Sequence, residues 1–293
     1  MQDFLRLKTN LIGLIGHPIK QTYSPLIHNL AIKIKNLDYY YLPFDVESIN
    51  LKRAIDGLIA LNFIGFNVTI PYKSKVLPLI NYLSEEALVI GAINTVTINE
   101  GNLSGYNTDV FGVVETLINY KSDLIEKEFT VFGAGGSARA VIYALIKNFK
   151  PTKIYLINRT EDRALVIKES FREKLKFNSI EVLNLVLPDL VEIIQSSKLV
   201  VNATSVGMYP EVDDSVINSE KFFNKDQIIF DLIYNPQETK FLEYAKRSGA
   251  TTINGLDMLI YQAAKSFELW TSEEFPISEV KQELGKILRD SYY

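Results

Sequence analysis

The side chains best suited to catalysis gather at the end of one apolar run, in the segment 67–73 (NVTIPYK). We expect a strand over residues 64–70, on which Asn67 and Thr69 alternate onto the same side. Lys73 follows just past the strand end, where sites on open α/β sheets usually form. A lysine tuned by burial and neighbours can transfer a proton, and the carboxylate of Asp109 is our candidate for orienting it. Taken alone, Lys73 also fits a solvated surface charge.

A second candidate site is the glycine turn, Gly133, Ala134, Gly135 and Gly136, which directly follows the β-branched and aromatic run 129–132. Apolar residues then recur at helical spacing from residue 138 to residue 149, which predicts an amphipathic helix. Glycines let the backbone approach a pyrophosphate, and the helix N-terminus offers free N–H groups and the positive end of its dipole. A plain strand-to-helix turn is the alternative, but the flanking pattern favours a dinucleotide site.

The end of the next expected strand, 154–157, selects the nucleotide. In a dinucleotide fold a carboxylate here binds the adenosine ribose of NAD, whereas an arginine accommodates the 2′-phosphate of NADP. This chain has Asn158 and Arg159 at that point, with Arg163 one turn further on. Two guanidinium groups can hold a phosphate through paired donors, so we predict NADP rather than NAD. The alternative is that both arginines are only solvent-exposed charges at a helix N-terminus, where acidic neighbours also lie.

Short apolar strands alternate with helices along the whole chain, which predicts an α/β fold in two domains. Residues 1–109 would form the first domain, completed by C-terminal helices within 255–293, and residues 110–254 the second. Strand and helix repeat through the second domain, and such crossovers imply a Rossmann-type, doubly wound parallel sheet covered on both faces. In the first domain we expect Ser24 to cap a helix that has Pro25 at its first position.

The remaining expected elements follow from the same patterns. We expect strands at 11–15, 39–42, 95–99, 103–106, 129–132, 180–183, 199–201, 227–233 and 251–253, and helices at 49–61, 84–90, 110–120, 160–175, 189–195, 239–247, 256–270 and from 278 onward.

Composition limits the function classes. The 293 residues are 47% hydrophobic and 23% charged, as in globular proteins. A net charge of −4 and the lack of a lysine or arginine block argue against nucleic-acid binding. Without cysteine the chain forms neither disulfides nor thiolate metal sites, which fits the cytoplasm. The sequence shows no signal-peptide pattern and no apolar run of transmembrane length, so we expect no membrane association.

Two histidines and one tryptophan complete the residues of interest. His17 and His28 have no metal-like partner cluster, so we expect no metal site. His28 falls on the first helix, where we expect packing or a backbone hydrogen bond. Trp270 ends the apolar helix 256–270, and we expect it at a domain contact.

Together these motifs resemble the shikimate dehydrogenase family, whose members use NADP to reduce 3-dehydroshikimate reversibly to shikimate, a step towards chorismate and the aromatic amino acids. The resemblance runs from Gly13 to about Gln262. Each mark alone is weak, but their joint occurrence in this order is specific. In chain order the marks are Pro18-Ile19, Ser24-Pro25, His28-Asn29, Asn67 to Lys73, Gly91 to Thr95, Gly105 to Asp109, Gly133 to Gly136, Asn158 to Thr160, Asn202 to Ser205 with Gly207-Met208, Asp231 to Tyr234 with Pro236 and Thr239, and Gly255 to Gln262.

The resemblance implies a role for each residue that matches the family pattern. Lys73 and Asp109 would form the catalytic pair, with Lys73 exchanging the proton of the hydroxyl whose carbon exchanges the hydride. The substrate would be held by Thr22 and Ser24 at its carboxylate and by Asn67, Thr69, Asn94, Tyr234 and Gln262 at its ring hydroxyls. NADP would be held by Gly133, Ala134, Gly135, Gly136, Ser137, Asn158, Arg159, Thr160, Arg163, Thr204, Leu232, Gly255 and Met258. The family pattern is compatible with a monomer or a homodimer.

One departure concerns the first hydroxyl of the substrate site. The family usually has Ser-x-Ser preceded by His, whereas this chain has Gln21-Thr22-Tyr23-Ser24. Thr22 keeps a hydroxyl but adds a methyl group, so quinate stays open as an extra substrate. One rival function is a quinate/shikimate dehydrogenase that accepts NAD, and Arg159 argues against it. Another is a catalytically silent NADP-sensing module, against which the pair Lys73 and Asp109 speaks.

Overall fold

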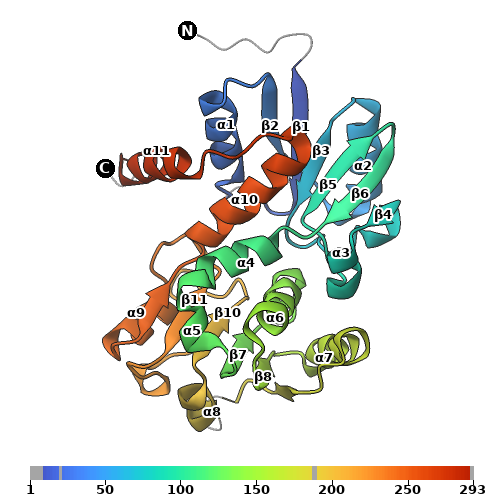
Figure 1. Ribbon diagram of the computed structural model, residues 1–293. Helices are drawn as coiled ribbons and strands as arrows, with labels where there is room; N and C mark the ends of the chain where they lie inside the picture. The colour runs from blue at the N-terminus through green and yellow to red at the C-terminus, as the bar shows by residue number, and fades with distance from the viewer. Residues whose placement is uncertain (1–8, 20–21, 187–189, 291–293) are drawn as a thin grey trace. The chain divides into compact units, whose positions relative to one another are not determined.

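The chain divides into two compact units in a computed structural model that describes residues 9–19, 22–186 and 190–290 (Figure 1). One unit comprises the chain up to Thr108 together with the chain from Leu259 onward, and the other comprises Asp109–Met258. In sequence, the second unit is therefore inserted within the first. Each unit is built on its own sheet, and the α/β fold class predicted above is confirmed.

The sheet of the first unit is mixed, with strand order β2-β1-β3-β5-β6-β4. β1 runs parallel to β2 and β3, whereas β5 is antiparallel to β3 and β6. A hairpin joins β5 to β6 through Glu100 and Gly101, which both have positive φ, as a tight turn between twisted strands requires. The strands are β1 (Asn10–Gly16), β2 (Tyr39–Asp45), β3 (Gly65–Val68), β4 (Tyr82–Leu83), β5 (Thr95–Asn99) and β6 (Asn102–Tyr106).

Helices from both ends of the chain pack in the first unit. They are α1 (Ser24–Ile34), α2 (Leu51–Ala60), α3 (Glu85–Ile90), most of α10 (Leu256–Thr271) and α11 (Ile277–Asp290), with 3₁₀ turns at Ser48–Asn50 and Leu77–Leu79. α11 contacts α1, and Trp270 of α10 donates a hydrogen bond from Nε1 to the carbonyl oxygen of Val96 (2.9 Å). A Cβ on Gly65 would lie 2.2 Å from that nitrogen, so the strand admits the indole only because Gly65 has no side chain. Trp270 is thus a core residue of this unit.

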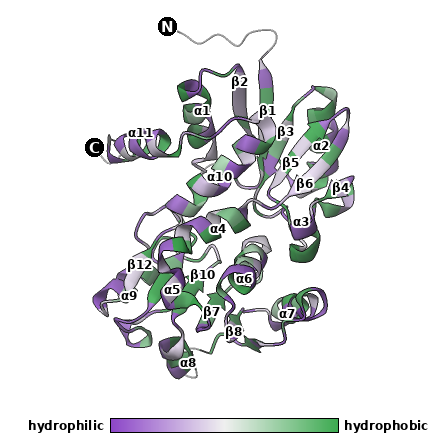
Figure 2. Ribbon diagram, in the orientation of Figure 1, coloured by the Kyte–Doolittle hydropathy of each residue, from purple (hydrophilic) through white to green (hydrophobic). Residues whose placement is uncertain are grey.

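The sheet of the second unit is parallel throughout, with strand order β12-β11-β10-β7-β8-β9. This is the order of a doubly wound dinucleotide-binding sheet, as predicted, with its switch point between β7 and β10. Buried runs form β7, β10 and β11, which are covered on both faces, and Figure 2 shows β7 and β10 in the hydrophobic colour. The strands are β7 (Glu128–Phe132), β8 (Lys153–Ile157), β9 (Ile180–Leu183), β10 (Leu199–Asn202), β11 (Ile228–Asp231) and β12 (Thr251–Ile253).

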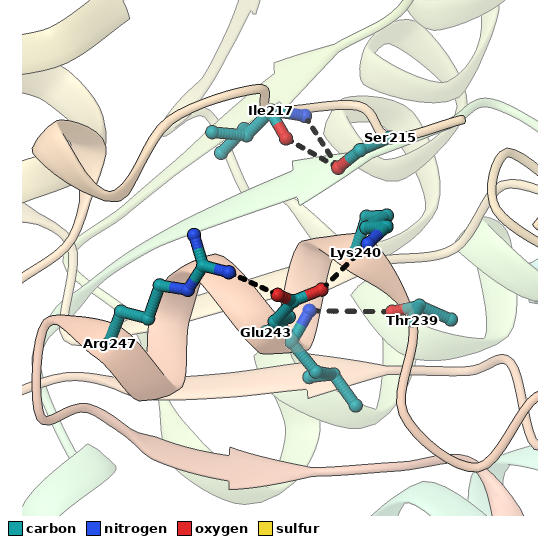
Figure 3. Close-up of polar contacts among 7 residues, drawn as sticks. Ser215, Ile217, Thr239, Lys240, Glu243 and Arg247 are labelled. Atoms are coloured by element: carbon teal, nitrogen blue, oxygen red, sulfur yellow. Dashed lines mark hydrogen bonds and ion pairs between the residues drawn. The ribbon is translucent and has the colours of Figure 1, made fainter. Parts of the chain in front are cut away.

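A side-chain cap marks the start of α9 in the second unit. The hydroxyl of Thr239 caps α9 by accepting a hydrogen bond from the amide of Leu242 (3.3 Å), and Glu243 pairs with both Lys240 (3.0 Å) and Arg247 (Figure 3). The helices are α4 (Asp109–Leu117), α5 (Lys121–Leu124), α6 (Gly136–Phe149), α7 (Glu161–Leu175), α8 (Val191–Ser196) and α9 (Lys240–Arg247), with 3₁₀ turns at Ile118–Tyr120 and Glu220–Phe222.

Two local predictions are wrong, and one strand was missed. Ser24 does not cap α1 but is its first residue, because its backbone amide donates to the hydroxyl of Thr22 (3.2 Å) in the residue before the cap. The strand predicted over 64–70 ends at Val68, so Thr69 does not share a strand face with Asn67. The two-residue strand β4 has no alternating pattern and was not predicted. Gln21 and Asp189, the expected first residue of a helix, lie outside the described residues.

Candidate active site

The carboxyl ends of four strands bring the predicted cofactor residues of the second unit together. The strand register pairs Phe132 with both Ile157 and Asn202, and Asn202 with Asp231. Four segments therefore leave the sheet at the same side, formed by the carboxyl ends of its strands, which we call the cofactor edge. They are the glycine turn, the segment from Asn158, the segment with Thr204 and the segment with Leu232. Ligands of open α/β sheets bind at this edge, beside the switch point.

The glycine turn has the geometry that a bound phosphate needs. Gly133 has φ +107°, and a Cβ there would lie 3.0 Å from both the carbonyl oxygen of Ala203 and Cγ2 of Thr204. Gly135 occupies the N-cap of α6 without a side-chain cap, and a Cβ on it would meet no atom within 4 Å. The turn thus combines open space with the N–H groups of the first turn of α6, which contains Ser137. These residues fit a dinucleotide.

The end of β8 has no acidic residue that would select NAD. Asn158 folds its side chain back, and its Nδ2 donates to the carbonyl oxygen of Thr160 (2.7 Å), the N-cap residue of α7. Arg159 and Arg163 are exposed, so both guanidinium groups are accessible to a ligand. Of the two acids in the first turn of α7, Glu161 is held by a hydrogen bond from Asn184 (3.0 Å). The electrostatics suit a 2′-phosphate better than a bare ribose.

Leu232 and Gly255, both predicted near the nicotinamide, are in direct contact. A Cβ on Gly255 would lie 2.0 Å from the carbonyl oxygen of Leu232, and the amide of Gly255 donates to Ile233 (2.9 Å). The amide of Leu232 in turn donates to the carbonyl oxygen of Asn202 (3.0 Å). Met258 is buried in the first turn of α10. This part of the edge is therefore fixed by backbone contacts.

A buried polar cluster in the first unit contains three predicted substrate residues. Asn94 is its centre: its Nδ2 donates to Oγ1 of Thr108 (2.8 Å) and to Oε1 of Gln262 (3.1 Å), and its Oδ1 accepts from the amide of Thr108 (2.7 Å). Asn67 donates to the carbonyl oxygen of Asn94 (2.9 Å) and accepts from the hydroxyl of Tyr41 (2.7 Å). All polar atoms of Asn67 are thus engaged within the protein, which indicates that it supports Asn94.

The same cluster contains residues that the sequence analysis did not single out. Ser266 of α10 is fully buried, and its hydroxyl lies 2.7 Å from Oγ1 of Thr95 and 3.0 Å from Oγ1 of Thr108. Thr108 immediately precedes Asp109, so this cluster fixes the backbone that leads to the predicted catalytic carboxylate. Ser266 follows Gln262 by one helical turn in α10, and this spacing was the signal available in the sequence.

The other predicted residues have defined local places. Thr22 donates from its hydroxyl to that of Ser24 (3.1 Å) at the start of α1, and the methyl group of Thr69 lies 2.4 Å from where a Cβ of Gly16 would be. Lys73 is half-buried, and its carbonyl oxygen accepts from Ile93 (2.8 Å). Asp109 is buried as the first residue of α4, and Tyr234 is half-buried after β11. Lys73 and Asp109 fall in different units, so their pairing stays a prediction.

The histidines do not gather with other ligands. His28 is fully buried and stacks on Tyr41 with ring centroids 4.3 Å apart, which confirms a packing role. His17 lies 2.6 Å from the carboxylate of Asp45. Among the described residues no group of three or more histidines, aspartates or glutamates is arranged to hold a metal ion. No helix in the described part of the chain is long and apolar enough to cross a membrane.

The parallel sheet, its glycine turn and its switch-point edge define a Rossmann-type nucleotide-binding protein with a second α/β unit. Family models match along the chain: the shikimate dehydrogenase substrate binding domain at residues 14–96, shikimate / quinate 5-dehydrogenase at 116–240, and the shikimate 5′-dehydrogenase C-terminal domain at 255–284. The chain belongs to the shikimate dehydrogenase family, which confirms the resemblance found in the sequence.

Individual relatives match over almost their whole length. The shikimate dehydrogenase (NADP(+)) of Methanococcus aeolicus is 43% identical over 281 residues, which cover 96% of this chain and 99% of the relative. A crystal structure of a shikimate dehydrogenase in complex with NADP+ superposes with a TM-score of 0.88 at 40% identity, covering 95% of this chain and 96% of the other. Shikimate 5-dehydrogenase from Listeria monocytogenes, in complex with shikimate and NAD, gives a TM-score of 0.85 at 34% identity, covering 97% and 99%.

Proposed function

We propose that this protein is an NADP-dependent shikimate dehydrogenase that reversibly reduces 3-dehydroshikimate to shikimate. The observation that carries the proposal is the match to NADP(+)-dependent relatives over 96% of the chain, together with Arg159 in place of an acid at the end of β8. The first unit would bind the substrate and the second NADP. Because the reaction leads towards chorismate and a chain without cysteine suits a reducing compartment, we place it in the cytoplasm.

The neutral cluster of the first unit supports a polyhydroxy substrate. Amide and hydroxyl groups can each pair with a ring hydroxyl, and a site that pairs every hydroxyl rejects analogues that lack one. Asn94 and Gln262 currently satisfy each other, so a substrate hydroxyl would replace one partner with another at little cost. Thr22 and Ser24, whose hydroxyls lie at the start of α1, would hold the carboxylate near the positive end of the helix dipole.

In this proposal the side chains of the protein carry out the proton transfer. When bound, NADPH supplies the hydride that reduces the ketone carbon. Lys73 would hold a proton at the ketone oxygen and deliver it there, and would take it back from the hydroxyl in the reverse reaction. Asp109 would orient the ammonium group of Lys73 as a fixed acceptor.

The test is a spectrophotometric assay in which wild type and Lys73→Ala are each offered shikimate or quinate with NADP or NAD. We expect rapid reduction of NADP with shikimate by wild type. In Lys73→Ala we expect kcat to fall by about 10²- to 10⁴-fold, the usual contribution of a positioned acid–base group, while NADP binding persists. NADP binding without turnover of either acid would overturn the proposed enzymatic function and favour a sensing module. Comparable turnover with quinate, or with NAD, would favour the broader dehydrogenase.

A further inference from the structure

Asp231, the last residue of β11, is a buried carboxylate without a cation beside it. Its side chain is fully buried, and its donors are the hydroxyl of Thr239 (2.6 Å), Nδ2 of Asn202 (3.0 Å) and the amide of Ile233 (3.1 Å). No lysine, arginine or histidine in the described ranges forms an ion pair with it. Burial raises the pKa of Asp231 to about 7, so the ionised form is held at a cost. Such a group at the edge that binds ligands is a candidate for function.

The carboxylate fixes which way the amide of Asn202 points. Oδ1 of Asp231 accepts a hydrogen bond from the amide of Ile233. Asn202 turns its Nδ2 towards this oxygen and also donates from Nδ2 to the carbonyl oxygen of Val206 (3.3 Å), so its own Oδ1 points away from Asp231. That Oδ1 accepts from both the amide (3.1 Å) and the hydroxyl (2.7 Å) of Thr204. Thr204 in turn packs against Gly133 of the glycine turn, at the 3.0 Å approach described above. Asp231 is therefore linked to Thr204 through one intervening amide.

Asp231 also holds the segment that follows it. Its bond from the amide of Ile233 closes a turn around Leu232, whose own amide is tied to the carbonyl oxygen of Asn202. Thr239 links the same carboxylate to the start of α9, which it caps. The end of β10, the turn after β11 and the start of α9 thus share one acceptor.

We propose that Asp231 is a positioning residue for the cofactor, which holds Thr204 and Leu232 where they would bind NADP without touching NADP itself. This inference rests on the proposed function, because the roles of Thr204 and Leu232 belong to it. In the sequence, Asp231 stands out only as the first residue of the family motif Asp231 to Tyr234.

The test compares Asp231→Leu, Asp231→Asn and a matched control, Gln227→Leu. Asparagine keeps an acceptor for Asn202 and Ile233 in the same shape, whereas leucine removes it. Gln227 lies just before the other end of β11, is 2% exposed, and its Nε2 donates to the carbonyl oxygens of Ile194 (2.5 Å) and Ser197 (2.7 Å). Its loss disturbs the same strand away from the binding edge.

The readouts are the Kd values for NADP and for shikimate by titration calorimetry, beside thermal unfolding. We expect Asp231→Leu to raise the Kd for NADP at least tenfold and that for shikimate less than threefold. Asp231→Asn should stay within threefold of wild type for both ligands, and Gln227→Leu should lower the melting temperature with the Kd for NADP unchanged. Should Asp231→Leu not fold, Asn202→Ala cuts the link to Thr204 and must produce the same selective loss.

Two results would overturn the inference. The first is a wild-type Kd for NADP in Asp231→Leu, or in Asn202→Ala if Asp231→Leu does not fold. The second is an equal rise of the Kd for NADP in Gln227→Leu, which would show that the loss of binding follows from lost stability alone. Its failure is distinct from failure of the proposed function. A wild type that binds NADP but oxidises no shikimate refutes the function and leaves the role of Asp231 to be decided by the Kd values. A wild type that binds no NADP overturns both.

Discussion

The two units bury polar groups in opposite ways. In the first unit the cluster around Asn94 and Ser266 consists only of amides and hydroxyls, and several of these pairs have no fixed donor. In the second unit the donors converge on one acceptor, the carboxylate of Asp231, and their direction is set. Hydroxyls rotate and both donate and accept, whereas a carboxylate only accepts.

This difference matches what each unit would bind. A cluster that can exchange partners adapts when the ring hydroxyls of a substrate enter it. In the second unit the hydrogen bonds have fixed donors, and backbone atoms pack closely against glycines, as Leu232 does against Gly255. Such a network gives a preformed site for the cofactor. We infer an adaptable substrate unit and a preorganised cofactor unit, and the following variants test that contrast.

The largest effect is expected where the cofactor edge is most rigid. Gly255→Ala would place its Cβ 2.0 Å from the carbonyl oxygen of Leu232, and overpacking of this kind costs about 3 kcal/mol. Because the segment must move, we expect the Kd for NADP to rise by roughly 100-fold. Gly57→Ala in α2, whose Cβ would meet no atom within 4 Å, is the control and should leave binding unchanged. Unaltered NADP binding by Gly255→Ala would show that this edge is adaptable after all.

Arg159→Ala tests whether the cofactor unit recognises the 2′-phosphate. Loss of a charge-assisted hydrogen bond costs about 2 kcal/mol, so we expect the KM for NADP to rise roughly 30-fold and that for NAD to stay unchanged. Arg172→Ala, further along α7, removes an exposed arginine paired with Glu169 (2.6 Å) and controls for lost surface charge. Equal effects on NADP and NAD would remove Arg159 from phosphate recognition.

The buried ionisable groups of the two units should respond to pH with opposite signs. Burial lowers the pKa of His28 from 6.5 to about 3, so only the unfolded chain binds this proton between those values, and stability falls as pH falls from 6.5 towards 3. Burial raises the pKa of Asp231 from 3.8 to about 7, so the folded unit binds the proton, and stability falls as pH rises through that window. Each slope is at most about 1.4 kcal/mol per pH unit.

His28→Phe isolates the contribution of the first unit. Trp270, the only tryptophan, lies 5.4 Å from His28 between ring centroids, so its fluorescence reports unfolding of this unit. We expect the urea concentration at the unfolding midpoint of wild type to decrease as the pH is lowered from 7 to 4.5 (roughly the middle of the window). The midpoint of His28→Phe should decrease less. Parallel curves for the two proteins would mean that His28 takes up its proton without unfolding.

The smallest effect is expected at the adaptable substrate unit. Thr22→Ser keeps the hydroxyl that donates to Ser24 and removes one methyl group. A single methyl group is worth about 1 kcal/mol in a pocket, so the ratio of KM values for quinate and shikimate should change by roughly fivefold or less. A larger change would show that the start of α1 is as rigid as the cofactor edge.

Patterns with a strong physical signature were predictable from sequence. The glycine turn, the parallel sheet of the second unit, the hairpin at Gly101 and the cap at Ser84, which accepts from Ala87 (3.2 Å), follow from local rules. The cap at Ser24 was mispredicted: Ser24 already lies inside the helix, where its own amide donates to the hydroxyl of Thr22. The strand through Thr69 was drawn too long, since its end depends on where neighbouring strands stop pairing.

The supporting residues of the site could not be found in the same way. Ser266 and Asn67 meet across 199 positions of sequence, and nothing local to either predicts the other. Asp231 ends an apolar strand, as surface aspartates also do, and only its burial separates the two cases. Sequence motifs thus pointed to residues that would contact ligands, and the structure was needed to find those that hold them.

The insertion of one unit within the other has a consequence for synthesis of the protein. The core of the first unit needs the indole of Trp270 beside Gly65 and the hydroxyl of Ser266 beside Asn67, and both come from the last part of the chain. Chains emerge from the ribosome N-terminal end first, and domains generally fold as units. The cofactor unit, which is continuous from Asp109 to Met258, can therefore complete its fold while the substrate unit still waits for its final helices. A chain truncated before α10 would keep its nucleotide-binding sheet and lose the substrate half.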